Sequence, residues 1–108
     1  MKNLFFETLK NNQIIVKEDY LNRQKKDILT DSIFYSYNTK IATIQQGVLY
    51  FTDFWNYSKT TSKYLYQYLD KEFDNITEHQ NEIKEALQSN NKKANFEKLI
   101  KNNIIKII

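Results

Sequence analysis

A single glycine, Gly47, lies between two short apolar runs near the middle of this 108-residue chain, which has no proline. Glycine lacks a Cβ, so it can supply the positive φ that a tight two-residue turn requires. The flanking runs, IATIQ at 41–45 and VLYFT at 48–52, are rich in β-branched and aromatic residues, as strands usually are. We therefore expect a β-hairpin with its turn at Gln46 and Gly47.

On the N-terminal side of this hairpin, the apolar residues have the spacing of a strand in some segments and that of a helix in others. SIFYSYN at 32–38 alternates along its length, which predicts a third strand joined to the hairpin in an antiparallel meander. QIIVK at 13–17 is β-branched and predicts a brief strand. KNLFFETLK at 2–10 and EDYLNRQKKDIL at 18–29 place apolar residues at helical spacing, so we expect a helix over each of them.

On the C-terminal side, from about residue 60, apolar residues recur about every 3.6 residues, as on one face of a helix. This spacing predicts helices over 61–74, 76–88 and 95–108. Thr60, Thr61 and Ser62 are candidate N-caps, because a hydroxyl oxygen can accept a hydrogen bond from a free backbone N–H. The expected fold class is α+β. A single domain, residues 1–108, contains a small antiparallel three-stranded β-meander flanked by N- and C-terminal helices.

Composition narrows the classes of function. The net charge is +3, and fifteen of the sixteen basic residues are lysine, which attracts phosphate without reading sequence. The chain has no cysteine, which excludes a disulfide framework, a thiolate metal site and a cysteine nucleophile. No stretch reaches the roughly 20 apolar residues of a membrane-spanning helix. We expect a cytoplasmic protein without membrane association and without a cofactor.

No catalytic constellation is present in the sequence. His79 is the single histidine, and its polar neighbours are typical of a surface position. Asp70 and Asp74 are spaced i, i+4 in a strongly charged segment, which is more typical of a solvated helix face than of a metal or acid–base site. We therefore expect that the protein is not an enzyme and that it binds no metal.

The stretch YSKTTSKYLYQYL at 57–69 is the best candidate for a binding site. Hydroxyl and cationic side chains open the expected helix, where unpaired backbone N–H groups carry partial positive charge, a combination that can hold a phosphate or carboxylate. The alternative is that one hydroxyl caps the helix while the others are solvated. The candidate residues are Ser58, Lys59, Thr60, Thr61, Ser62 and Lys63.

The adjacent aromatic run, LYFTDFWNY at 49–57, offers a second kind of contact. Rings at neighbouring positions of a strand cannot all face inward. Tyr50, Trp55 and Tyr57 are therefore candidate anchors for a partner protein or stacking platforms for bases. The alternative is that helices cover both faces of the sheet and every ring belongs to the core.

Two segments, SYNTKIATIQQGVLYFT at 36–52 and YSKTTSKYL at 57–65, resemble a small domain of unknown function found in tailed-phage and mobile-element proteins. The likeness extends over about residues 35–69 and departs at Tyr64, where that pattern often has histidine. It implies a phage or prophage origin and no established activity. The matching positions are Tyr37, Asn38, Thr39, Ile41, Ala42, Leu49, Tyr50, Phe51, Thr52, Tyr57, Ser58, Thr60, Thr61, Ser62 and Lys63.

These features together favour function by binding. We expect a steric inhibitor or modulator of a host protein, nucleoprotein or defence complex, of anti-CRISPR or other anti-defence type. The alternative is an accessory protein that binds nucleic acid through its lysines. The apolar C-terminal end, IIKII, leaves a homodimer open, because such an end docks on its own core or on a second subunit. Acidic residues that could mimic phosphates are Asp70, Glu72, Asp74 and Glu78.

Overall fold

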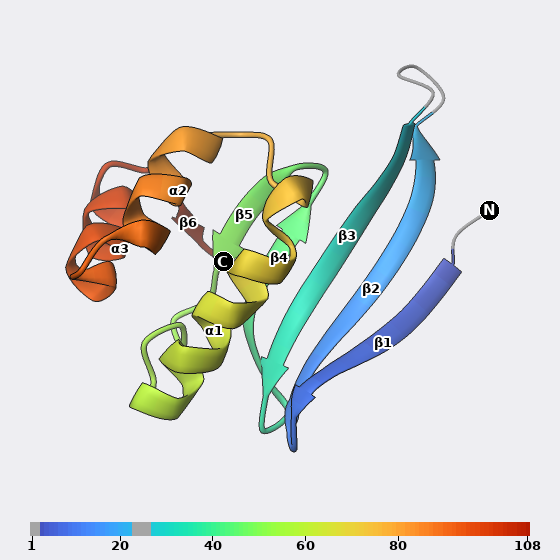
Figure 1. Cartoon of the computed structure of the whole chain (residues 1–108), viewed down its shortest axis with the longest axis horizontal. Helices are drawn as coiled ribbons and strands as arrows, with labels where there is room; N and C mark the ends of the chain where they lie inside the picture. The colour runs from blue at the N-terminus through green and yellow to red at the C-terminus, as the bar shows by residue number, and fades with distance from the viewer. Residues whose placement is uncertain (1–2, 23–26) are drawn as a thin grey trace.

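The structure is a computed structural model that describes residues 3–22 and 27–108 (Figure 1). Within these residues six strands form one sheet, in chain order from one edge to the other. Figure 1 shows the helices gathered on one face of that sheet. The elements are β1 (Asn3–Lys10), β2 (Gln13–Asn22), β3 (Asp27–Ser36), β4 (Thr39–Gln45), β5 (Val48–Phe51), α1 (Lys59–Lys71), η1 (Phe73–Asn75), α2 (Gln80–Gln88), α3 (Lys92–Lys101) and β6 (Lys106–Ile107).

The α+β class is correct, but the three-stranded meander with a helix at each end is wrong. The segments expected to be N-terminal helices are strands wherever the structure describes them, since β1 begins at Asn3, β2 runs to Asn22 and β3 begins at Asp27. Apolar cross-strand pairs, such as Phe6 with Val16, outweigh a weak local preference for helix. The basic cluster of the second expected helix, Arg23, Lys25 and Lys26, lies outside the described residues.

The hairpin at Gln46 and Gly47 is confirmed, with φ angles of 50° and 82° at the two turn residues. The Gly47 carbonyl accepts hydrogen bonds from Thr77 N and Glu78 N, at 2.8 and 3.1 Å. A Cβ at position 47 would lie 2.1 Å from Thr77 Oγ1. Glycine is therefore required both for the turn and for the close approach of the segment that leads into α2.

The C-terminal helix expected over 95–108 is too long. α3 ends at Lys101, and Asn103 has a left-handed φ of 59°, a conformation that commonly ends helices. The chain then returns to the sheet, where β6 runs parallel to β5 and Ile108 N donates to the Phe51 carbonyl at 2.9 Å. This short strand covers an edge of β5 that would otherwise be open.

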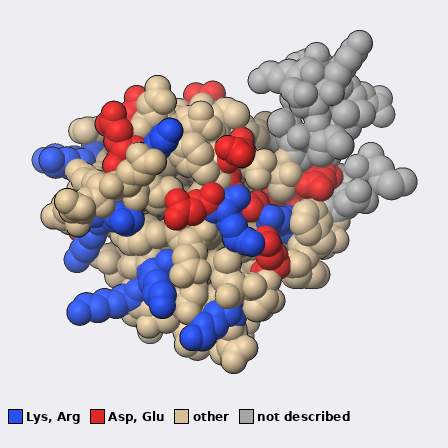
Figure 2. Space-filling view, in the orientation of Figure 1, with Lys and Arg blue, Asp and Glu red and all other residues tan. Residues whose placement is uncertain are grey.

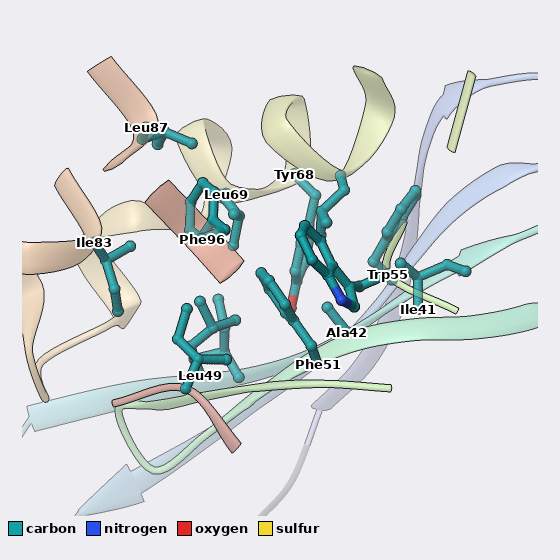
Figure 3. Packing of buried hydrophobic residues seen from close by; sticks show 14 of the residues in the cluster. Ile41, Ala42, Leu49, Phe51, Trp55, Tyr68, Leu69, Ile83, Leu87 and Phe96 are labelled. Carbon is teal, nitrogen blue, oxygen red and sulfur yellow. The ribbon is translucent and has the colours of Figure 1, made fainter. Parts of the chain in front are cut away.

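The core fills the space between the helices and one face of the sheet (Figure 3). The ring of Tyr68 on α1 stacks on Phe34 of β3, with centroids 5.5 Å apart, and its hydroxyl lies 2.7 Å from Ser32 Oγ. Burial raises the pKa of the Tyr68 phenol far above its ordinary value, so the ring stays neutral. Of the helices described, none combines the length and the hydropathy that crossing a membrane requires.

Candidate binding site at the start of helix α1

Three chain segments meet at the end of the sheet where α1 begins, in the lower part of Figure 1: the β1–β2 turn, the β3–β4 turn and the first turn of α1. Tyr37 N donates to the Asn12 carbonyl at 2.8 Å and so joins the two hairpin turns. Tyr37 and Asn38 have φ angles of 51° and 67°. Asparagine tolerates this conformation, but a bulky residue rarely adopts it. Since Tyr37 is also 61% exposed, packing does not account for its presence.

The hydroxyl cluster is partly used to attach α1 to the sheet. Ser58, not a residue of 60–62, is the N-cap: its Oγ accepts from Thr61 N at 3.1 Å and donates to Thr61 Oγ1 at 3.1 Å. Thr61 is buried, and its Oγ1 lies 3.3 Å from Ser36 Oγ on β3. Thr60 is exposed and Ser62 is half-buried. Two of the four hydroxyl residues therefore have structural partners.

A pocket of about 380 Å³, which we call the aromatic pocket, opens beside these hydroxyls. The rings of Phe54 and Tyr57 pack edge to face at its mouth, with centroids 6.3 Å apart and an angle of 71° between their planes. Both rings remain largely accessible, at 49% and 74% exposed. The pocket lining thus combines exposed aromatic rings with hydroxyl groups. Its lining residues are Ser36, Tyr37, Thr39, Ile41, Phe54, Tyr57 and Thr61.

A second pocket, of about 190 Å³, shares Tyr37 with the first, and we call it the polar pocket. Gln13 of β2 lines it and is only 1% exposed. Neither Nε2 nor Oε1 of this amide has a hydrogen-bond partner within the protein. A buried polar group in this state costs about 1–3 kcal/mol. Its lining residues are Lys10, Asn11, Asn12, Gln13, Tyr37, Thr60 and Tyr64.

Replacing Gln13 with methionine, which has a similar shape and no amide, should therefore raise the free energy of unfolding by about 1 kcal/mol. Urea denaturation followed by circular dichroism measures this change. Gln67→Met, at an exposed position of α1, is the matched control and should change stability by less than about 0.5 kcal/mol. A loss of stability in Gln13→Met would show that the amide is satisfied by ordered water in solution.

The structure separates the three aromatic candidates. Tyr57 lies in the site just described. Trp55 is only 8% exposed and stacks on Phe51 with centroids 5.3 Å apart, so it belongs to the core and offers no contact surface (Figure 3). Tyr50 pairs with Thr43 on β4, while Leu49 and Phe51 on either side of it point into the core. Tyr50 therefore lies on the opposite face of the sheet.

The cationic candidates lie at the surface of the site. Lys59 and Lys63 are exposed, and Lys63 Nζ lies 5.4 Å from the centroid of the Tyr64 ring. Lys10 lines the polar pocket, and Lys40 follows the β3–β4 turn. In Figure 2 the lowest part of the visible face, where α1 begins, carries basic side chains and no acidic ones. Lysines therefore lie at this end of the molecule, and one of them, Lys10, lines the polar pocket.

Sequence reasoning missed several residues of the site, chiefly Tyr37, Phe54 and Gln13. The expected strand over 32–38 ran through Tyr37 and Asn38, whereas β3 ends at Ser36. The available sequence signal was Asn38 itself, because asparagine is common in two-residue hairpin turns. Nothing in the sequence marks Gln13 as buried, since that follows from its place beneath α1.

A separate cluster of charges lies at the C-terminal end of α1. Lys17 Nζ lies 2.8 Å from Glu7 Oε2 and 2.8 Å from Glu72 Oε2, and Lys71 also pairs with Glu7. Hydrogen bonds from Lys17 and Lys71 lower the pKa of Glu7. Burial alone would lower the pKa of Lys17, but the two carboxylates outweigh it and raise that pKa. Glu72 is 2% exposed, so it cannot belong to a phosphate-mimicking surface.

The remaining titratable candidates lie at the surface. His79 is exposed and precedes α2, with Nδ1 3.8 Å from Glu82 Oε2. Asp70 and Asp74 are exposed. Over residues 3–22 and 27–108, no group of three or more His, Cys, Asp or Glu side chains could hold a metal ion.

Comparison with known proteins gives a family and no function. Searches of curated proteins and of solved structures find no significant match. The model of a family of unknown function, DUF8033, matches residues 6–98, which contain part of β1, the whole of β2 to β5 and most of the helical part. The chain therefore belongs to the DUF8033 family of unknown function.

Proposed function

We propose that the chain acts by binding rather than by catalysis, and that the aromatic pocket receives an apolar side chain of a partner protein. The observation that supports this most is Tyr37, a bulky residue held at a φ of 51° with 61% of its surface exposed. Backbone strain at an exposed ring without packing is a feature of functional sites. Asparagine or glycine would form the same turn with less strain.

The rings around the pocket have the properties of interface anchors. Tyr37, Phe54 and Tyr57 are large, exposed and fixed on short turns, and tyrosine is enriched among residues that carry most of the energy of protein interfaces. Hydroxyls of Ser36 and Thr39 inside the pocket can orient the polar edge of a bound side chain. A pocket of about 380 Å³ has room for an aromatic or a large aliphatic side chain.

The resemblance to phage and mobile-element domains suggests which class of molecule the partner belongs to. We propose a protein or nucleoprotein of a host cell, such as a defence complex, whose working surface the chain covers sterically in the cytoplasm. A rigid sheet with α1 attached to it by buried hydrogen bonds is suited to steric occlusion, because little ordering is needed on binding.

The test combines Tyr37→Asn with Tyr57→Ser. Asparagine suits the turn at position 37, and position 57 is 74% exposed, so the double variant should remain folded. Each ring should contribute about 2 kcal/mol if it is an anchor, so the affinity for a partner captured from host lysate should fall roughly 30-fold or more for each ring. Lys84→Ser, an exposed position on α2, is the control. Undiminished capture by the double variant would refute the proposal.

A second candidate is binding of single-stranded nucleic acid at the same end of the molecule. Specific support comes from the lysines around exposed rings: Lys10, Lys59 and Lys63 can contact phosphates while Tyr37 and Tyr57 stack on bases. Nuclease treatment of the lysate should then abolish capture, and the affinity for a thymidine oligonucleotide should fall steeply with salt. Capture that resists nuclease, with no oligonucleotide binding at low salt, would eliminate this candidate.

A further inference from the structure

The polar pocket is lined by polar side chains that have no partner within the described part of the chain. The neighbouring aromatic pocket differs, because there the Thr61 hydroxyl is hydrogen-bonded to Ser58 and lies 3.3 Å from Ser36 Oγ. Polar groups that converge on a concave site without bonding to one another are available to a ligand. The groups of the polar pocket without a hydrogen bond or ion pair are the side chains of Lys10, Asn11, Asn12, Gln13 and Thr60 and the hydroxyl of Tyr64.

Two of these side chains are more than nine-tenths buried, so packing fixes their positions. Gln13 is 1% exposed and Tyr64 is 6% exposed, and both belong to the pocket lining. Burying a polar group without a partner is unfavourable, and most buried polar groups in folded proteins are therefore hydrogen-bonded. Unpartnered groups in the lining of a pocket are accounted for by a ligand that supplies the missing hydrogen bonds.

The charge of the pocket selects the kind of ligand. Lys10 is the cation of the lining, and neither pocket has an aspartate or glutamate among its lining residues. Thr60 lies in the first turn of α1, a helix of 13 residues that has no acidic residue in that turn to offset its positive end. The hydroxyl and amide groups beside Lys10 can donate hydrogen bonds. The pocket therefore favours an anionic group that accepts them.

We infer that the polar pocket binds a carboxylate. A carboxylate carries one negative charge, which the single ammonium group of the lining balances. A phosphate monoester carries about 1.5–2 negative charges at pH 7 and would be balanced only in part. The volume of about 190 Å³, against about 380 Å³ for the aromatic pocket, suits the small polar end of an aspartate or glutamate side chain.

The two pockets are placed to receive neighbouring side chains of one partner segment. Tyr37 lines both of them, so they lie side by side. In an extended segment, side chains two residues apart point the same way and are separated by about 7 Å. Such a segment can place an apolar side chain in the aromatic pocket and an acidic side chain in the polar pocket. This step rests on the proposed function, and it specifies the partner sequence as an apolar and an acidic residue separated by one position.

Titration of the full chain with two short peptides, followed by NMR spectroscopy, tests the inference. The probes are acetyl-Phe-Ala-Glu-amide and its neutral counterpart acetyl-Phe-Ala-Gln-amide, each also in the reversed order, because a segment can lie in either direction. In one order the glutamate peptide should bind roughly 10-fold more tightly than the glutamine peptide, since hydrogen bonds to a charged group are the stronger ones.

Variants of the lining show whether the preference for glutamate arises in the polar pocket. Lys10→Met, at an exposed position, should reduce that preference to less than about 2-fold while the rest of the spectrum is retained. Tyr64→Phe keeps the buried ring, removes only its hydroxyl and should reduce the preference by roughly 3-fold. Lys84→Met, at an exposed position of α2, is the matched control and should leave the preference unchanged.

The outcomes separate this inference from the proposed function. Equal affinities for the two peptides in both orders overturn the carboxylate site, and the aromatic pocket still stands if Tyr57→Ser weakens both peptides. A preference for glutamate, in peptides whose binding Tyr57→Ser does not weaken, supports the carboxylate site and removes the aromatic pocket. Acetate that binds as tightly as the glutamate peptide makes a free carboxylate, rather than a partner segment, the ligand. Inorganic phosphate that displaces this peptide at lower concentration than acetate does overturns the assignment to a carboxylate.

Discussion

Replacing Trp55 with alanine is expected to lower the free energy of unfolding by about 3–5 kcal/mol, the range for loss of a buried tryptophan. Trp55 is 8% exposed, and its ring stacks on Phe51, which also contacts the ring of Phe96 with centroids 5.7 Å apart. The substitution therefore leaves a cavity between the 52–58 segment and the sheet, beside the ring of Phe51. Urea denaturation of the variant measures the effect.

Tyr57→Ala is the matched control, because Tyr57 is 74% exposed and lies two residues away on the same segment. It should change stability by less than about 0.5 kcal/mol. Comparable stability of the two variants would contradict the core position of Trp55. The distinction matters for function, since a loss of binding in a Trp55 variant reports unfolding, whereas a loss in a Tyr57 variant reports a lost contact.

The sequence predicts the middle of the fold well and the N-terminal part poorly, for a physical reason. The hairpin at Gly47 depends on a local requirement for positive φ, which one residue reveals. β1 depends on pairing with β2 and on burying one face against α1, and neither is visible locally. The apolar residues of NLFFETLK are spaced so that they could form one face of a helix, or could be divided between the two faces of a strand, about equally well.

The candidate site likewise contains some residues that local sequence rules identify and others that only the tertiary structure brings together. The hydroxyl and lysine residues at 58–63 mark a helix start that local capping rules can find, but the cap is Ser58 and not one of the expected residues 60–62. Gln13 and Tyr37 join the site only because two hairpin turns and α1 meet there. Trp55 and Tyr57 look alike in sequence, but the turn after β5 sends one ring into the core and the other to solvent.

Replacing Lys17 with methionine is expected to destabilise the chain by about 3–5 kcal/mol, because it leaves the Glu72 carboxylate buried without its cation. Lys17 Nζ lies 2.8 Å from Glu72 Oε2, and Glu72 is 2% exposed at the end of α1. Adding Glu72→Gln to Lys17→Met removes the stranded charge and should recover much of the loss, with a coupling energy of about 1–3 kcal/mol. Lys71→Met, at a position where the side chain is 44% exposed, should cost less than about 1 kcal/mol.

The pH dependence of stability provides an independent check on this cluster. The pKa of Glu7 is lowered in the folded chain, so its contribution is complete above its ordinary value of 4.5 and is lost as the pH falls through the lowered pKa. The pKa of Lys17 is raised, so its contribution is complete below 10.5 and is lost as the pH rises through the raised pKa. Lys17→Met should therefore show a shallower decline in stability than the wild type at both ends. Identical acid and alkaline slopes in the two proteins would mean that Lys17 and Glu7 are not paired in solution.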